Sequence, residues 1–189
     1  CCVQRPLTMP EKIGPNIFYH AAVVPKWGWL RGGYLGCIRS VRRQLEPIQP
    51  DIVHGQGTER YCALAAALSG FPNVVTLHGN MRSVARISRA RPFSYHWLAA
   101  RLERFVLPRT DGVVCITRYT QRAVADLVRQ TWIVPNAVDA RFFDVQARPD
   151  PAELPNGLCV GTVCDYKNQN DFIRALDPLA ENKQFRRLF

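Results

Sequence analysis

Short apolar runs alternate with longer runs of helical spacing along most of the chain. Strand-like apolar runs occur at residues 51–54, 74–77, 112–116 and 132–134. A turn at Gly55-Gln-Gly57 is predicted after the first of them. Residues 58–69 then have a helix-like pattern, which Gly70 closes from a C-terminal capping position. Strands that alternate with helices in this way are typical of parallel βαβ units. The pattern therefore predicts an α/β fold in which helices flank a parallel sheet.

The segment before these units gives a weaker signal. Residues 17–24 form an apolar run with the character of a strand, although His20 interrupts it. Apolar residues at helical spacing over 35–45 predict a helix, and Pro47 and Pro50 are expected to stop it.

A change of composition follows the last of the four strand-like runs. Residues 147–156 are rich in proline and poor in apolar residues, which is typical of an interdomain linker. A new strand over 157–163 and a helix that begins near Asn170 are predicted after this linker. The chain is therefore expected to contain parts of two domains.

The composition is that of an ordinary globular protein, with 47% apolar and 21% charged residues in a chain of 189. The longest apolar runs fall well short of the ~20 residues that a membrane-spanning helix needs. The seven cysteines lie in apolar surroundings, without a C-x-x-C pair or the spacing of zinc ligands. We therefore expect a cytoplasmic protein with reduced, buried thiols and without a metal site.

Polar or small residues stand at the end of each predicted strand. They are His54 with Gln56, His78 with Gly79, Thr117, Asn136 and, after the linker, Gly161 and Thr162. Ligands of parallel sheets bind outside the carboxyl ends of the strands, so these residues are expected to share one rim. Structural roles compete with this interpretation: a lone histidine is often structural, a threonine caps the next helix, and an asparagine after proline marks a turn. A histidine followed by glycine, as at residue 78, is the strongest functional candidate.

Five segments, in this order and spacing, resemble the GT-B glycosyltransferases of the large retaining family 4. They are residues 50–54 (PDIVH), 74–79 (VVTLHG), 111–117 (DGVVCIT), 133–139 (IVPNAVD) and 158–161 (LCVG). The fourth segment, followed by a linker and a new strand that ends in Val-Gly, is the most specific. The resemblance covers about residues 45–176.

In this family two Rossmann-like domains face each other across a cleft, the first binding the acceptor and the second the nucleotide-sugar donor. With the nucleotide sugar as substrate, we expect neither a cofactor nor a metal. The resemblance implies an acceptor-side Rossmann-like domain over residues 1–146 that lacks its first strand, a linker over 147–156, and the first strand and helix of an incomplete donor-binding domain over 157–189. His78 matches the cleft histidine that approaches the transferred sugar, and Asn136 and Asp139 match the loop that leads to the hinge. Gly161 and Lys167 match residues on the donor side.

The sequence also departs from the pattern of the family. Thr162 stands where an arginine is usual, so a neutral hydroxyl replaces one of the two cations that face the departing phosphate. Gln56 replaces a frequent second histidine, and Ala137 replaces a common glycine. A pair of glutamates that hold the donor has no counterpart before Phe189, so the chain is expected to be a truncated fragment without activity of its own.

Arginine supplies almost all of the formal net charge of +10, and residues 82–109 concentrate it. The stretch contains Arg82, Arg86, Arg89, Arg91, Arg101, Arg104 and Arg109, a single acid, Glu103, and aromatic residues that include Trp97. One interpretation is a solvated helix face whose aromatic residues lie in the core. Another is a contact with an anionic membrane or with an anionic acceptor, since the acceptors of this family are often lipid-linked. Nucleic acid is not expected as a partner, because no RNA- or DNA-binding signature accompanies the charge.

The sequence therefore predicts a glycosyltransferase fragment that moves a sugar from a nucleotide-sugar donor to a glycan or lipid-linked acceptor with retention. Peripheral contact with the inner membrane face is compatible with this hypothesis. Two alternatives stay open: a non-catalytic glycosyltransferase-like binding module, which Thr162 favours, and a basic α/β protein that binds nucleic acid.

Overall fold

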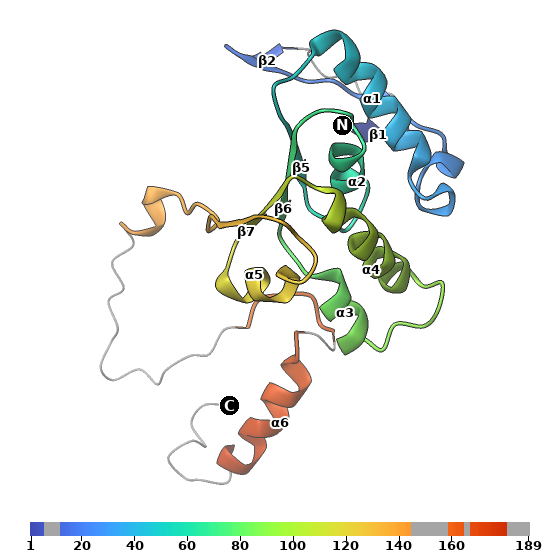
Figure 1. Cartoon of the computed structure of the whole chain (residues 1–189). Helices are drawn as coiled ribbons and strands as arrows, with labels where there is room; N and C mark the ends of the chain where they lie inside the picture. The colour runs from blue at the N-terminus through green and yellow to red at the C-terminus, as the bar shows by residue number, and fades with distance from the viewer. Residues whose placement is uncertain (6–11, 145–158, 165–166, 181–189) are drawn as a thin grey trace. The chain divides into compact units, whose positions relative to one another are not determined.

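The computed structural model describes residues 1–5, 12–144, 159–164 and 167–180 (Figure 1). The chain divides into two compact units, each of which is described by itself. The first comprises Cys1–Arg86 and Ala90–Asn136, and the second comprises Ile87–Arg89 and Ala137–Phe189. The linker predicted over 147–156 lies outside the described residues, so the predicted domain boundaries stay a prediction.

A parallel sheet of four strands forms the centre of the first unit (Figure 1). In order across the sheet, the strands are β5 (Val53–Gln56), β6 (Asn73–Leu77), β7 (Gly112–Cys115) and β8 (Thr131–Ile133). Gln56 pairs with Thr76, and Cys115 lies between Leu77 and Ile133, so the strands end at nearly the same level. The α/β fold with a parallel sheet is confirmed.

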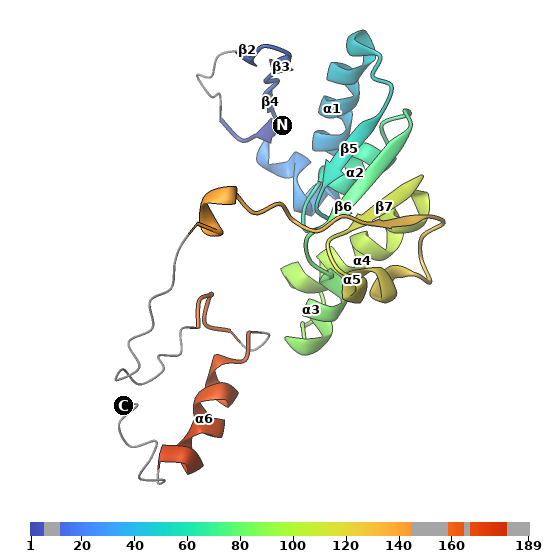
Figure 2. The same ribbon diagram turned by 90° about the vertical axis from the view of Figure 1, so that its left-hand side faces the viewer.

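Helices connect successive strands and cover the sheet. They are α1 (Leu35–Ile48), α2 (Cys62–Ala67), α3 (Met81–Ile87), α4 (Tyr95–Val106) and α5 (Arg118–Val124). As Figures 1 and 2 show, α2 packs against β5 and β6, α4 packs against α2, and α5 packs against β7 and β8. Short 3-10 turns occur at Lys26–Gly28, Leu30–Gly32 and Leu107–Arg109.

One face of the sheet forms the core of the first unit. The side chains of this face without exposed surface are Val75, Leu77, Val113 and Cys115. His54, Gln56 and Trp132 belong to the other face, since successive residues of a strand point to opposite sides, and all three are exposed.

Gly55 lies inside β5 and not in the turn that the sequence predicted. A Cβ atom at this position would lie 2.9 Å from the carbonyl oxygen of Cys62, so α2 packs on the strand at a distance that only glycine allows. The bend comes at Gly57, whose φ is +82°. Because β5 continues to Gln56, His54 lies within the strand, and the prediction that His54 ends it was wrong.

Residues 17–24 do not form the single strand that their apolar run predicted. β3 (Ile17–Phe18) pairs antiparallel with β2 (Lys12–Gly14), whereas β4 (Ala22–Val23) pairs parallel with β1 (Cys2–Val3). The run breaks because its two ends pair with different strands. At the break, the carbonyl oxygen of His20 accepts a hydrogen bond from the amino group of Cys1.

α1 ends between the two prolines that were expected to stop it, because it continues past Pro47 but ends before Pro50. The helix continues to Ile48 and ends at Gln49, whose φ is +49° and whose N–H donates to the carbonyl oxygen of Leu45. Pro47 lies in the last turn, so only Ile48 follows it in the helix.

The described part of the second unit contains one short 3-10 turn, Ala140–Phe142, and one α-helix, α6 (Gln169–Ala180). The predicted helix is confirmed, although it begins one residue before Asn170. Residues 159–163 form no strand, and residues 157–158 lie outside the described residues, so the strand predicted over 157–163 is not seen. Cys159, which was expected in a buried strand, is exposed.

The cysteines differ in their surroundings. All seven are free thiols; Cys2, Cys37 and Cys115 are buried, whereas Cys1 is exposed like Cys159. Burial raises the pKa of Cys37 to about 12 and also raises the pKa of Cys2 and Cys115. None of the helices in the described ranges has the length and apolar character to span a bilayer.

Candidate functional site at the carboxyl edge of the sheet

The carboxyl ends of the four strands bring three candidate residues to one edge of the first unit. Gln56 is the last residue of β5, His78 directly follows β6, and Thr117 lies two residues after β7. Asn136, three residues after β8, is exposed and is the last residue of this unit. The sequence therefore predicted which residues follow each strand, and the parallel topology places them at the same edge.

Hydrogen bonds join the polar residues of β5 and β6. The Nε2 atom of His78 lies 2.9 Å from Oε1 of Gln56, and an amide oxygen only accepts, so His78 donates through Nε2. The amide nitrogen of Gln56 lies 3.3 Å from Nε2 of His54, which in turn lies 2.7 Å from the hydroxyl of Thr76. Gln56, noted from sequence as a departure from the family, thus fixes the orientation of the exposed His78 ring.

Gly79 leaves open space next to this histidine. A Cβ atom at Gly79 would meet only the carboxylate tip of Glu59, at 3.4 Å, which is an ordinary contact distance. The atoms of the chain therefore do not require glycine here. Because Gly79 has no side chain, a ligand can approach the backbone closely beside His78.

Glu103, on α4, is the residue of this region that sequence analysis missed. Its side chain has no exposed surface. Oε2 accepts hydrogen bonds from the Thr58 hydroxyl at 2.7 Å and from the Met81 N–H at 2.9 Å, and Oε1 accepts from the Arg82 N–H at 3.2 Å. One carboxylate therefore binds both the loop after β5 and the first turn of α3. The loop follows Gln56 and the turn follows His78, so Glu103 holds together the two segments next to these residues.

A signal for Glu103 was present in the sequence. Ala99, Glu103 and Val106 recur at helical spacing, and all three are buried in the structure. A single carboxylate on the apolar face of a helix, inside a stretch of arginines, indicates a buried acceptor and not a solvated charge.

Thr117 has the structural role that the sequence proposed as an alternative. Its hydroxyl oxygen accepts a hydrogen bond of 3.1 Å from the Thr120 N–H and thereby caps α5. The side chain is also exposed at the rim, so a ligand contact for Thr117 stays a prediction.

Asp139, in the second unit, is paired with its near neighbour. Its carboxylate accepts hydrogen bonds from the backbone N–H, Nε and a terminal nitrogen of Arg141, each at 3.0 Å. These bonds lower the pKa of Asp139 and cap the turn Ala140–Phe142. The structure thus gives Asp139 a local role, and its predicted hinge role stays a prediction.

The donor-side candidates of the second unit surround the turn before α6. The Lys167 N–H donates to the carbonyl oxygen of Cys164 at 3.0 Å, and the Gln169 side chain donates to the carbonyl oxygen of Thr162 at 3.1 Å. Gly161, Thr162 and Lys167 are all exposed. Asn168, at φ +59°, adopts the left-handed conformation that glycine favours, and asparagine tolerates it.

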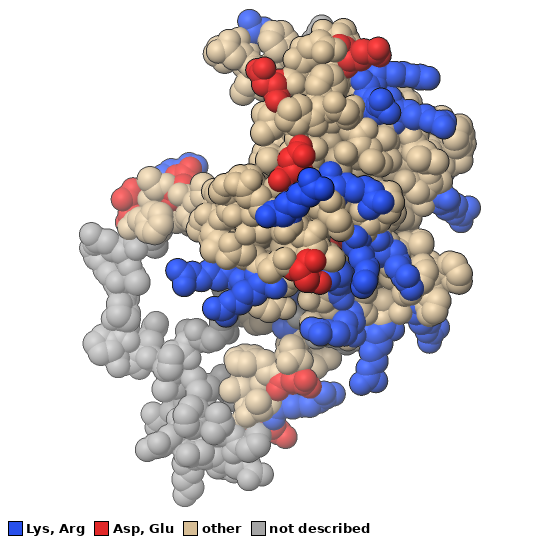
Figure 3. Space-filling view, in the orientation of Figure 1, with Lys and Arg blue, Asp and Glu red and all other residues tan. Residues whose placement is uncertain are grey.

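The arginine-rich stretch spans α3 and α4, and Lys and Arg side chains gather over this part of the molecule and α5 in Figure 3. The guanidinium of Arg101 lies 4.8 Å from the Trp97 ring, and that of Arg109 lies 3.8 Å from the Phe105 ring. Phe93 is 81% exposed, and its ring lies 5.3 Å from that of Trp97. These aromatic residues therefore pair with each other and with arginines at the surface, and the interpretation that places them in the core is wrong.

The other predicted contacts of this stretch have simpler surroundings. Arg86, Arg89, Arg91 and Arg104 are exposed. Arg82 is half-buried and lies within ion-pair distance of Glu103 and Asp126. The predicted contact surface thus consists of several solvated guanidiniums and one, that of Arg82, which the protein itself binds.

A parallel α/β unit with polar residues at its carboxyl edge is the architecture of a Rossmann-like domain of the GT-B type. The family model Glycosyltransferase Family 4 matches residues 1–142, and the chain belongs to this family. The resemblance to this family is thereby confirmed over residues 1–142, which contain four of the five segments; the fifth, residues 158–161, lies outside the match. No curated protein matches the chain.

Proposed function

We propose that this chain forms the acceptor side of an enzyme that moves a sugar from a nucleotide-sugar donor to a glycan or lipid-linked acceptor with retention. The observation that carries the proposal is His78, held by Gln56 at the carboxyl edge of a parallel sheet in a member of a glycosyltransferase family. In such sheets this edge is where ligands bind.

In this proposal His78 contacts the transferred sugar. A ring fixed through Nε2 needs no reorientation when the substrate binds, which lowers the entropic cost of reaching the reactive geometry. Its other ring nitrogen, Nδ1, is then an acceptor for a sugar hydroxyl. Gln56 acts as the positioning residue.

In this proposal Lys167 stabilises the negative charge that develops on the departing diphosphate. The Thr162 hydroxyl is a second, neutral hydrogen-bond donor to the diphosphate, and no metal ion takes part. A cation aimed at a developing negative charge stabilises the transition state more than the ground state. Asn136 and Asp139 are proposed to lead from the acceptor side toward the donor side.

A peripheral contact with an anionic membrane at the cytoplasmic face is the second part of the proposal. Its support is the exposed Phe93 beside Trp97 and the guanidinium of Arg101 on the same ring. Aromatic rings that alternate with arginines favour the interface between water and anionic lipid.

The test is a transfer assay on the full-length protein with a panel of nucleotide sugars. His78→Ala should lower turnover by more than about tenfold, which corresponds to roughly 1.4 kcal/mol of transition-state stabilisation. His96→Ala, which removes another histidine whose side chain makes a ring contact with Tyr95, should have little effect. Equal turnover in both variants would refute the role of His78, and donor binding without any turnover would favour the non-catalytic module.

A further inference from the structure

A pocket of about 570 Å³ lies between α3 and α5 in the first unit. Its lining includes Asn80, Arg82, Arg86, Tyr119, Arg122 and Asp126. Asn80 is two residues from His78, so the pocket begins next to the candidate catalytic histidine. Its volume lies within the usual range for small-molecule sites.

Two walls of this pocket are held in place by the protein. A terminal nitrogen of Arg82 donates to the carbonyl oxygen of Ala123, and the same guanidinium lies 3.5 Å from Asp126 and 3.7 Å from Glu103. The side-chain oxygen of Asn80 accepts a hydrogen bond of 2.7 Å from the Ser83 N–H. Arg82 and Asn80 therefore have fixed positions before any ligand binds.

Three further side chains of the pocket, those of Asn80, Arg86 and Arg122, offer N–H donors that have no partner among the described residues. Arg86 and Arg122 are exposed, and neither guanidinium forms an ion pair or hydrogen bond within the described residues. Asn80 is only 8% exposed, and its side-chain nitrogen has no hydrogen-bond partner among the described residues. Tyr119, which is 66% exposed, adds a hydroxyl. Asp126 is the single carboxylate of the lining, against three guanidiniums.

We propose that this pocket binds a phosphate group of the acceptor substrate. Guanidinium forks match the oxygens of phosphate, and a surplus of donors in one pocket selects a ligand that carries acceptors and negative charge. The inference rests on the proposed function, since it takes the molecule beside His78 to be the acceptor. It adds three residues that the sequence did not single out: Asn80, Tyr119 and Arg122.

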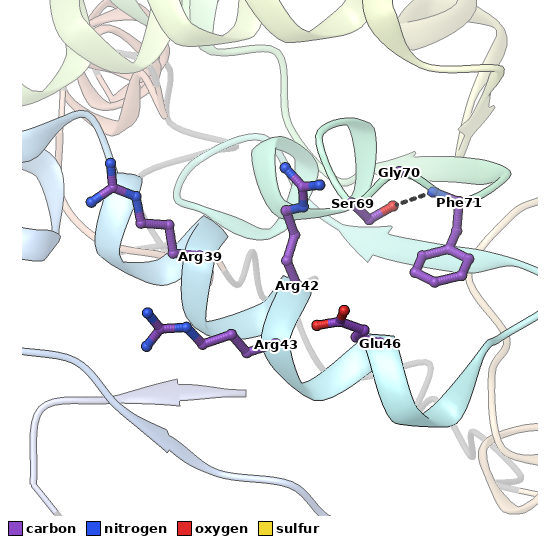
Figure 4. Close-up of a pocket in the computed structure, with 7 residues that line it drawn as sticks. All are labelled: Arg39, Arg42, Arg43, Glu46, Ser69, Gly70 and Phe71. Carbon is purple, nitrogen blue, oxygen red and sulfur yellow. Dashed lines mark hydrogen bonds between the residues drawn. The ribbon is translucent and has the colours of Figure 1, made fainter.

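A second arginine pocket serves as the matched control. It is lined by Arg39, Arg42, Arg43 and Glu46 of α1 and by residues 69–71, which precede β6, so it lies toward the opposite edge of the sheet. Figure 4 shows that the guanidiniums of Arg39, Arg42 and Arg43 point in separate directions. Arg39→Ala removes the same charge as Arg122→Ala without touching the pocket beside the rim.

The experiment is an NMR titration of the 189-residue chain with glycerol 3-phosphate and with inorganic phosphate. Binding should be saturable and should shift the side-chain amide of Asn80 and the Nε resonances of Arg86 and Arg122. Arg122→Ala and Arg86→Ala should each weaken binding by about tenfold or more, the usual effect of one charge-assisted contact. Arg39→Ala should leave the affinity unchanged, and Asp126→Asn should raise it.

Vesicles distinguish the two sources of the phosphate. Binding to phosphatidylglycerol vesicles, but neither to phosphatidylcholine vesicles nor to the soluble ester, would support the pocket and assign the phosphate to a lipid headgroup, provided that it requires Arg122 and not Arg39. Absence of binding to every probe, or an equal loss in Arg39→Ala and Arg122→Ala, would overturn the proposal. The titration needs no turnover, so its result is independent of whether the protein proves to be a transferase.

Discussion

Replacement of Glu103 by alanine should destabilise the first unit more than the loss of any exposed acid. The carboxylate is fully buried and accepts hydrogen bonds from Thr58, Met81 and Arg82. Glu103→Ala leaves two backbone N–H groups and one hydroxyl without their acceptor, and it leaves the Arg82 guanidinium with a single carboxylate neighbour.

The expected loss follows from these contacts. Each buried donor that loses its acceptor costs about 1–3 kcal/mol, and the three donors to Glu103 together bring the expected loss to about 3–5 kcal/mol. For a chain of this length, each kcal/mol lowers the melting temperature by roughly 2–4 °C. Glu103→Ala should therefore melt roughly 6–20 °C below the unsubstituted protein, measured by circular dichroism.

Local and control measurements make the result specific. Amide hydrogen exchange at Met81 and Arg82 should accelerate in Glu103→Ala, because their acceptor is gone. Glu46→Ala, on the solvent face of α1, should change the free energy of unfolding by no more than about 0.5 kcal/mol. A melting temperature of Glu103→Ala within about 2 °C of the unsubstituted protein would contradict the reasoning.

Three further predictions follow from single sites. Thr117→Ala should lower the free energy of unfolding by about 1 kcal/mol in urea denaturation, because α5 loses its cap, and Thr117→Ser should restore it. Burial raises the pKa of Cys37 and of Tyr61 each to about 12, so between about pH 9 and that value the unfolded chain releases protons that the folded chain keeps. Stability should therefore fall as pH rises above about 9, and a melting temperature that is constant over this window would refute the assignment. Lys167→Ala should lower kcat/KM of the full-length protein by about ten- to hundredfold, and Thr162→Arg should raise donor affinity; unchanged kinetics in Lys167→Ala would place phosphate recognition elsewhere.

The four strands of the sheet could be predicted from the sequence because each is a short apolar run. Such a run reflects the burial of its own residues and can be recognised without knowing their tertiary partners. It failed where the outcome depends on tertiary contacts. Gly55 was interpreted as a turn residue, but the carbonyl oxygen of Cys62 approaches it so closely that β5 needs glycine there. Residues 17–24 were interpreted as one strand, but their two ends pair with different strands. Neither partner can be identified from the run itself.

The candidate site shows the same division. The residues that follow the strands were identifiable because a strand end is a local feature, and the parallel topology then brings Gln56 and His78 together. The hydrogen bond between them was not predictable, since a glutamine that replaces a histidine is as compatible with a lost contact as with a new one. Only the register of β5 and β6 places the amide oxygen of Gln56 within 2.9 Å of Nε2 of His78.

The fold also divides the three arginines of the pocket between α3 and α5 into two kinds. Arg82 lies within ion-pair distance of Glu103 and Asp126, so its charge is largely balanced inside the protein and serves to fix α3 against α5. Arg86 and Arg122 have no such partner within the described residues, so their charge acts on whatever enters the pocket beside them. A ligand of this pocket therefore meets two exposed guanidiniums beside the bound side chain of Arg82. The buried carboxylate of Glu103, which has no exposed surface to offer a ligand, helps to hold Arg82 in place.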